Sequence, residues 1–336
     1  MKPVDDLMIK CPLKHEIRVT FWEPFIRKLK KNPITYLTLY SPPLMDVKYF
    51  FHKGLIEVND GVFTNVVGVG IDAESEAESN AQVNYRLDLL LHGDINELLD
   101  ESTKTKKKAQ LIEKFPFDVI NLDYVDTLHR KNLNVELSPH INAIETILSK
   151  QKNSEINQFV LFITTCVNVD HYNDILLSLL KENFDENIKN TRGFLTTLQD
   201  VCNCSTSEEY KAMNPNNYFA LSLVKTLLLQ LKEYNFTIED ADIRWLIRDA
   251  YKQPIEKNLL HLAFHVKKFN PTKATSIKMI GKRLNNVEHY AVGLIKLDYE
   301  TLRVSTDWDT LSAKHKDQIE RIYNLNFEII IPEIKE

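Results

Sequence analysis

Three aspartates each follow or close a short β-forming run, and this placement suggests that they serve one site. Asp72 follows NVVGVGI, Asp94 follows YRLDLLLHG, and Asp123 lies within FDVINLDYVD. A carboxylate can accept hydrogen bonds through both oxygens, so it suits the hydroxyl and amino groups of a ligand. Ligands of open α/β sheets bind beyond the carboxyl ends of the strands, near the point where strand order reverses. The pattern therefore predicts a ligand site lined by these aspartates.

The first β-rich run ends in a proline turn at the same predicted edge. ITYLTLY, at 34–40, leads directly into Ser41-Pro42-Pro43. Proline fixes φ, so we expect a rigid turn that leads into the following helix. Tyr40 and Ser41 would then touch a ligand at the mouth of the sheet without performing chemistry.

The order of elements predicts the sheet that positions these residues. Short β-rich runs alternate with longer helical stretches, which is typical of repeated βαβ units. We expect an α/β fold with a doubly wound, mostly parallel sheet and strands at 34–40, 65–72, 85–94, 117–126 and 157–167.

The pattern along the whole chain predicts three regions. Residues 1–185 would form a Rossmann-like core with an N-terminal extension, and 186–257 a helical insertion or cap. Residues 258–336 would complete the sheet, with 258–270 and 287–299 forming an antiparallel hairpin. The apolar helix at 218–234 carries leucines on nearly every side, which favours burial or a subunit interface. A homo-oligomer or a hetero-complex would follow from such an interface.

These elements resemble the class I AdoMet-dependent methyltransferases, whose Rossmann-like sheet ends in an antiparallel hairpin. The resemblance spans roughly residues 34 to 185 and is carried by YLTLYSPPLMD, VVGVGID, LLLHGDI and FDVINLDYVD. It implies S-adenosylmethionine (AdoMet) as cofactor. The implied cofactor contacts are Asp72 with the ribose hydroxyls, and Gly93, Asp94 and Ile95 with the adenine. The implied catalytic residues are Asp123 and Tyr124, which would lie near the transferable methyl group and orient the acceptor.

The first loop departs from this family. Such enzymes have a glycine-rich turn after the first strand, because glycine allows close approach of the cofactor. Here YSPPLMD has no glycine. A Ser-Pro-Pro-aromatic motif holds the target amine in methyltransferases that act on DNA, but Leu44 stands at the aromatic position.

Simpler interpretations of the acidic residues also stand. Asp72 and Asp94 could cap helices, and Asp123 could pair with a basic side chain. The chain could also keep the fold as a non-catalytic scaffold or ligand-sensing subunit of a multi-protein bacterial system.

Composition limits the other function classes. The net charge is −5, so the sequence lacks the basic character of a dedicated nucleic-acid binder, and the run Lys104 to Lys108 favours a solvated helix over a phosphate contact. The four cysteines of the chain lack zinc-site spacing, and no metal is predicted. The absence of long apolar runs and of a signal peptide predicts a cytoplasmic protein without a membrane partner.

Overall fold

The computed structural model describes residues 17–40, 44–70, 86–124, 128, 139–167, 189, 209, 223–224, 226–228, 230–247, 258–268 and 301–303. The predictions for Ser41, for Asp72 and for a strand at 287–299 lie outside these residues.

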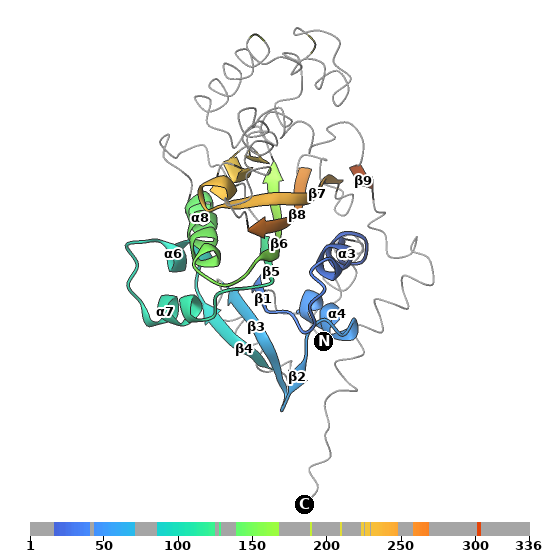
Figure 1. The fold of residues 1–336 in the computed structure, drawn as a ribbon. Coiled ribbons are helices and arrows are strands. Elements are labelled where there is room, and N and C mark those ends of the chain that lie inside the picture. Colours follow the sequence, from blue (N-terminus) through green and yellow to red (C-terminus); the bar gives the residue numbers. More distant parts are fainter. Residues whose placement is uncertain are drawn as a thin grey trace, which may run out of the picture.

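Within the described residues, nine strands form one mixed sheet (Figure 1). They are β1 (Tyr36–Leu39), β2 (Val58–Asn59), β3 (Val62–Gly70), β4 (Arg86–His92), β5 (Val119–Asp123), β6 (Gln158–Val167), β7 (Phe236–Ile247), β8 (Asn258–Lys268) and β9 (Thr301–Arg303). The five strands predicted before residue 170 are confirmed as β1, β3, β4, β5 and β6, with ends that shift by a few residues.

Five neighbouring strands run parallel, in the order β4-β3-β1-β5-β6. Leu37 of the central strand β1 is in register with Val67 on one side and with Ile120 on the other. β8 is antiparallel to β6, and β7 pairs antiparallel with the other edge of β8. The fold is therefore the predicted Rossmann-like α/β type, a mostly parallel sheet that ends in an antiparallel hairpin.

The hairpin itself differs from the prediction. Its first strand is β7, which lies inside the stretch 186–257 that the sequence predicted to be helical. Both edges of β8 are occupied by β6 and β7, so the expected pairing of 258–270 with 287–299 is wrong. The acidic residues of FTIEDADIRWLI conceal the strand pattern, and a register shift between Ile238 and Asp240 interrupts its alternation.

Helices cover both faces of the sheet (Figure 1). One face carries a π-helical turn, η1 (Arg18–Trp22), which continues into α3 (Glu23–Arg27), and also α4 (Met45–His52). The other carries α6 (Ile95–Leu99), α7 (Lys106–Glu113) and α8 (Pro139–Lys152). A helical stretch that includes 230–233 joins α8 on this second face, because Gln230 donates to the carbonyl of Ile141. No described helix is long and apolar enough to cross a membrane.

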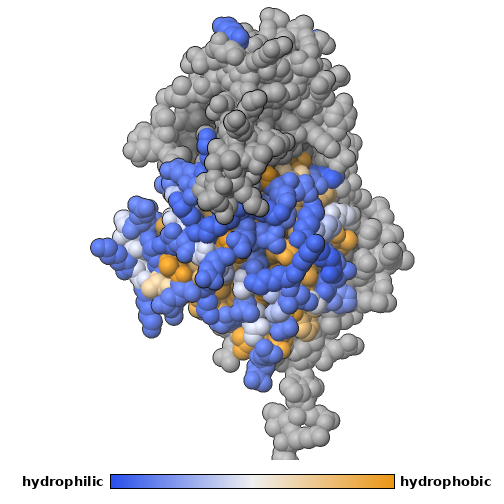
Figure 2. All heavy atoms as spheres, in the orientation of Figure 1, coloured by the Kyte–Doolittle hydropathy of each residue, from blue (hydrophilic) through white to orange (hydrophobic). Residues whose placement is uncertain are grey.

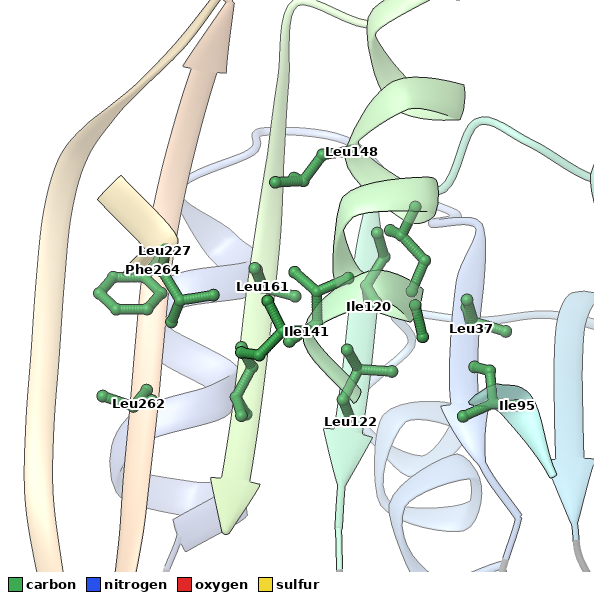
Figure 3. Packing of buried hydrophobic residues seen from close by; sticks show 14 of the residues in the cluster. Leu37, Ile95, Ile120, Leu122, Ile141, Leu148, Leu161, Leu227, Leu262 and Phe264 are labelled. Atoms are coloured by element: carbon green, nitrogen blue, oxygen red, sulfur yellow. The ribbon is translucent and has the colours of Figure 1, made fainter. Parts of the chain in front are cut away.

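The main hydrophobic core lies between the sheet and α8 (Figure 3). Leu37, Ile120 and Leu161 point from neighbouring strands toward Ile141 and Leu148 of α8. All five side chains are fully buried. Burying one such side chain contributes about 1.5–3 kcal/mol, so this layer fixes the strand register and with it the positions of the strand ends.

Candidate ligand site at the carboxyl edge of the sheet

The strand order reverses its direction between β1 and β5, which are direct neighbours. From β1 the chain crosses by α4 to β3 on one side, and from β5 it crosses by α8 to β6 on the other. The two helices pack on opposite faces of the sheet. This is the topological switch point, where the crevice outside the strand ends binds ligands in open α/β folds.

Backbone hydrogen bonds place three predicted site residues at this carboxyl edge. The amide of Tyr40 donates to Val69 over 2.7 Å, that of Gly93 to Gly70 over 2.6 Å, and that of Tyr124 to Thr164 over 2.9 Å. Asp94 and Asp123 therefore stand at the same edge, as the sequence predicted, although β3 and β1 separate β4 from β5.

The half-buried ring of Tyr40 rests on two glycines of β3. A Cβ added to Gly70 would lie 3.0 Å from Cδ1 of Tyr40, and one added to Gly68 would lie 3.3 Å from its Cδ2. Contacts this short leave no room for a side chain beneath the ring. The end of β1 therefore presents an aromatic ring directly before the glycine-free sequence SPPLMD.

Asp94 caps α6, as one of the sequence interpretations allowed. Its Oδ1 accepts from the backbone nitrogen of Asn96 at 2.9 Å and from the Asn96 amide at 2.7 Å. Both bonds use Oδ1, and Oδ2 takes part in neither. The preceding Gly93 has φ +151°, a conformation that L side chains rarely adopt. Asp94 is thus held rigidly, with one carboxylate oxygen outside the cap.

Tyr124 is buried after the end of β5, against the start of α8. It is 5% exposed, and its ring meets that of His140 edge-on with centroids 4.5 Å apart. Among the described residues its hydroxyl oxygen has no hydrogen-bond partner. Burial, assisted by the negative charge of Asp94, raises the pKa of Tyr124 well above its ordinary value. The hydroxyl therefore stays protonated and can donate a hydrogen bond.

Two more buried polar atoms at this edge lack partners within the described part of the chain. They are Nδ1 of His92, the last residue of β4, and Oδ1 of Asn96, in the first turn of α6. A buried polar atom without a partner costs about 1–3 kcal/mol, so such atoms are rare in native structures. The chemistry of this set, donors and acceptors together, fits the polar edges of a nucleoside.

Asp123 and Tyr124 belong to opposite faces, since successive residues of a strand alternate. Tyr124 packs in the core with α8, whereas Asp123 is in register with Thr164, whose hydroxyl contacts Nδ1 of His261 at 2.9 Å. Burial lowers the pKa of His261 to about 4, although Asp123 and Asp242 act in the opposite direction. The two residues were predicted beside one methyl group, and the fold separates their side chains across the sheet.

The remaining predicted residue, Ile95, is 3% exposed and packs in the main core (Figure 3). Sequence reasoning missed His92, Asn96 and His140. His140 could have been found, because SPHINAIE opens the helix that follows the fourth strand and therefore begins near the ligand edge.

The lysine run forms α7, as predicted, and two of its ammonium groups contact the backbone. Lys107 donates to the carbonyl of His92 at 2.8 Å, and Lys108 donates to that of Asp100.

Figure 2 shows that the visible surface of the described residues is mostly hydrophilic, with small apolar areas. The described residues include no group of three acidic, histidine or cysteine side chains that could hold a metal ion.

The order and direction of the strands define a Rossmann-like α/β fold of the class I methyltransferase type. The chain belongs to the PP_RS20740-like family, whose model matches residues 11–329. No curated protein matches the sequence.

Several solved structures are similar at low identity. The plantazolicin methyltransferase BamL has 10% identity and a TM-score of 0.37, over 77% of this chain and 85% of that one. A SAM-dependent methyltransferase from Anabaena variabilis has 10% identity and a TM-score of 0.34, over 80% and 96%. TYW2 of M. jannaschii has 7% identity and a TM-score of 0.33, over 71% of each chain. The fold assignment rests on the strand order and register of the chain itself.

Proposed function

We propose that this protein binds AdoMet at the carboxyl edge of its sheet and transfers the methyl group to an acceptor. The observation that carries the proposal is the buried hydroxyl of Tyr124, which lacks a partner in the described residues and stands beside the switch point between β1 and β5. Such a costly group calls for an explanation, and a bound ligand that accepts its hydrogen bond supplies one. The choice of AdoMet among nucleosides follows from the methyltransferase type of the sheet.

Each residue at the edge has a role that its chemistry allows. Oδ2 of Asp94 accepts from the exocyclic amino group of adenine while Oδ1 keeps the α6 cap. The protonated Tyr124 hydroxyl donates to a ligand oxygen or ring nitrogen, and Asn96 Oδ1 accepts. AdoMet, when bound, supplies an electrophilic methyl group on a sulfonium. The chain then has to orient the acceptor and exclude water, which is catalysis by proximity.

Asp123 serves the acceptor side in this proposal. It stands at the end of β5 on the face of Trp22 and His261, away from Tyr124. A carboxylate at this place can accept a proton or a hydrogen bond from the attacking group of the acceptor. The proposal thus places the nucleoside on the α8 side and the acceptor on the α4 side of the switch point.

One observation favours a second candidate, a ligand sensor without methyl transfer. The ring of Tyr40 lies over Gly68 and Gly70, and the sequence SPPLMD that follows it contains no glycine, so we infer less space near the end of β1 than a glycine-rich sequence would leave. A nucleoside could then bind while the donor methyl group remains out of line with an acceptor.

Calorimetric titration of the full chain with AdoMet and S-adenosylhomocysteine tests binding. Tyr124→Phe removes one hydrogen bond and should weaken binding about 2- to 10-fold. Tyr234→Phe is a matched control, because its hydroxyl bonds Glu145 at 3.1 Å, away from the edge. Absence of saturable binding to the wild type would refute both candidates.

Transfer of a labelled methyl group from AdoMet to pools of protein, nucleic acid and small molecules separates the two candidates. The methyltransferase predicts label in one pool, reduced in Asp123→Asn. A sensor predicts binding with no label in any pool.

A further inference from the structure

A buried arginine on the α4 side of the sheet has no counter-charge among the described residues. Arg18, in the π-helical turn η1, is 9% exposed, and its Nε is buried without a hydrogen-bond partner. No ion pair or hydrogen bond to its guanidinium occurs among the residues that the structure describes. Buried charges are normally paired, because removing an ion from water costs several kcal/mol. Arg18 is an exception that needs a cause.

Within the part of the chain that the structure describes, the acidic side chain nearest to Arg18 in sequence is Glu23, and it already has partners. Glu23 forms an ion pair with Arg27 at 2.7 Å and with Lys53 at 3.3 Å, and it accepts from the Tyr49 hydroxyl at 2.5 Å. The positive charge of Arg18 also reaches this hydroxyl, since it acts to lower the pKa of Tyr49 against the stronger effect of burial. Arg27 and Lys53 thus already neutralise the Glu23 carboxylate, which is not paired with Arg18.

The direction of the N-terminal helix places Arg18 toward the ligand edge. The helical segment ends at Arg27, and two residues later the carbonyl of Leu29 accepts from the side chain of Gln158 at the beginning of β6. One and a half to two turns earlier, Trp22 bonds His261, which is in register with Thr164 near the end of β6. Arg18 lies one further turn in the same direction. It therefore stands on the carboxyl side, on the face to which Asp123 belongs.

The surrounding contacts hold this turn in place. The Arg18 guanidinium lies over the ring of Trp22, with Cζ 5.9 Å from its centroid. That ring stacks on Phe162 with centroids 5.1 Å apart, and its Nε1 donates to His261. Single π-helical turns inside α-helices are frequent at functional sites, because they redirect side chains. Arg18 is thus fixed by a rigid aromatic support.

We infer that Arg18 is the anion-binding residue of a second ligand, one that carries a carboxylate or a phosphate group. A planar guanidinium binds such groups through two parallel hydrogen bonds, and a buried site strengthens them. Asp123 on the same face would hold the uncharged, reacting end of this ligand. Only the assignment of this ligand as the methyl acceptor rests on the proposed function.

The first test measures anion binding by thermal unfolding of the full chain. Inorganic phosphate or acetate replaces chloride stepwise at constant ionic strength. The anion that raises Tm more identifies the kind of anionic group that the site binds. We expect a saturable rise in Tm for the wild type and for Arg27→Gln, a matched control on the same helical segment with a 54% exposed side chain. Arg18→Gln should bind the anion at least about 10-fold more weakly. Equal binding by Arg18→Gln, or no rise in the wild type, would overturn the inference.

The second test uses stability without ligand. A buried charge kept for binding costs stability, so Arg18→Met should unfold at an equal or higher Tm than the wild type in chloride. A clear fall in Tm would assign Arg18 a structural role and contradict the inference. AdoMet binding by Arg18→Met should match that of the wild type. Anion binding in a chain that fails to bind AdoMet would refute the proposed function while the anion site stands.

Discussion

The indole of Trp22 donates from Nε1 to Nε2 of His261 over 3.1 Å, across 239 residues of sequence. Because an indole only donates, Nε2 must be unprotonated and the imidazole proton must lie on Nδ1, which then donates to the hydroxyl of Thr164. The bond ties the N-terminal helix to β8 and fixes a neutral tautomer near the ligand edge.

Trp22→Phe should therefore destabilise the protein by more than the loss of buried apolar surface alone would. The phenyl ring can still stack on Phe162, but Nε2 of His261 loses its donor in a buried site. We expect a fall of about 1–3 kcal/mol in the free energy of unfolding, measured by urea denaturation. A value within experimental error of the wild type would show that the bond contributes nothing.

The same histidine predicts a dependence of stability on pH. Its pKa is about 4 in the folded protein, and that of an unfolded histidine is about 6.5. Between pH 6.5 and pH 4 this histidine is protonated in the unfolded chain but neutral in the folded protein. Its contribution to the free energy of unfolding is therefore complete above pH 6.5 and is lost as the pH falls toward 4. The total loss is on the order of 3 kcal/mol.

The difference in unfolding free energy between wild type and His261→Gln, followed from pH 7 to pH 4, isolates this effect. The difference should change in favour of the variant as the pH falls. A constant difference would mean that the imidazole of His261 is protonated as easily in the folded protein as in the unfolded chain.

Contact between Tyr40 and β3 can be tested by adding one methyl group. Gly70→Ala places a Cβ against the Tyr40 ring and should destabilise the protein by about 1–3 kcal/mol. In a Tyr40→Ala background the same substitution should cost much less, because the ring is gone. A double-mutant cycle with no coupling between the two positions would show that the ring lies elsewhere.

Asp94 carries two roles that one substitution separates. Asp94→Asn keeps an oxygen that can cap α6, so the free energy of unfolding should change by less than about 0.5 kcal/mol, whereas Asp94→Ala should cost about 1 kcal/mol. AdoMet binding should weaken in both variants, because the charged acceptor is lost. Full binding by Asp94→Asn would leave Asp94 a helix cap alone.

The sequence predicts the parallel half of this fold because its strands are short buried runs rich in Val, Ile and Leu, as in NVVGVG and NQFVLFI. It fails at β7, whose strand is amphipathic, acidic and interrupted by a register shift. At the site, strand order brings Asp94 and Asp123 to one edge, as expected. The sequence does not reveal the interactions of these residues in the fold. Asp94 accepts hydrogen bonds from Asn96, and Tyr124 lies on the opposite face of the sheet from Asp123.

Arg18 shows a different limit of sequence reasoning. In IRVTFWEPF it has the spacing of a polar residue on an amphipathic helix, which predicts exposure. In the folded chain its side chain is buried instead, with the guanidinium over the ring of Trp22. The structure therefore identifies Arg18 as a candidate binding residue, whereas the sequence alone does not.

The most direct test of the central claim is a crystal structure of the full chain with S-adenosylhomocysteine at saturating concentration. We predict that the nucleoside lies at the carboxyl edge, with its polar atoms within hydrogen-bond distance of the Tyr124 hydroxyl and of Asp94. A nucleoside bound elsewhere, or both side chains without contact to it, would contradict AdoMet binding at this edge.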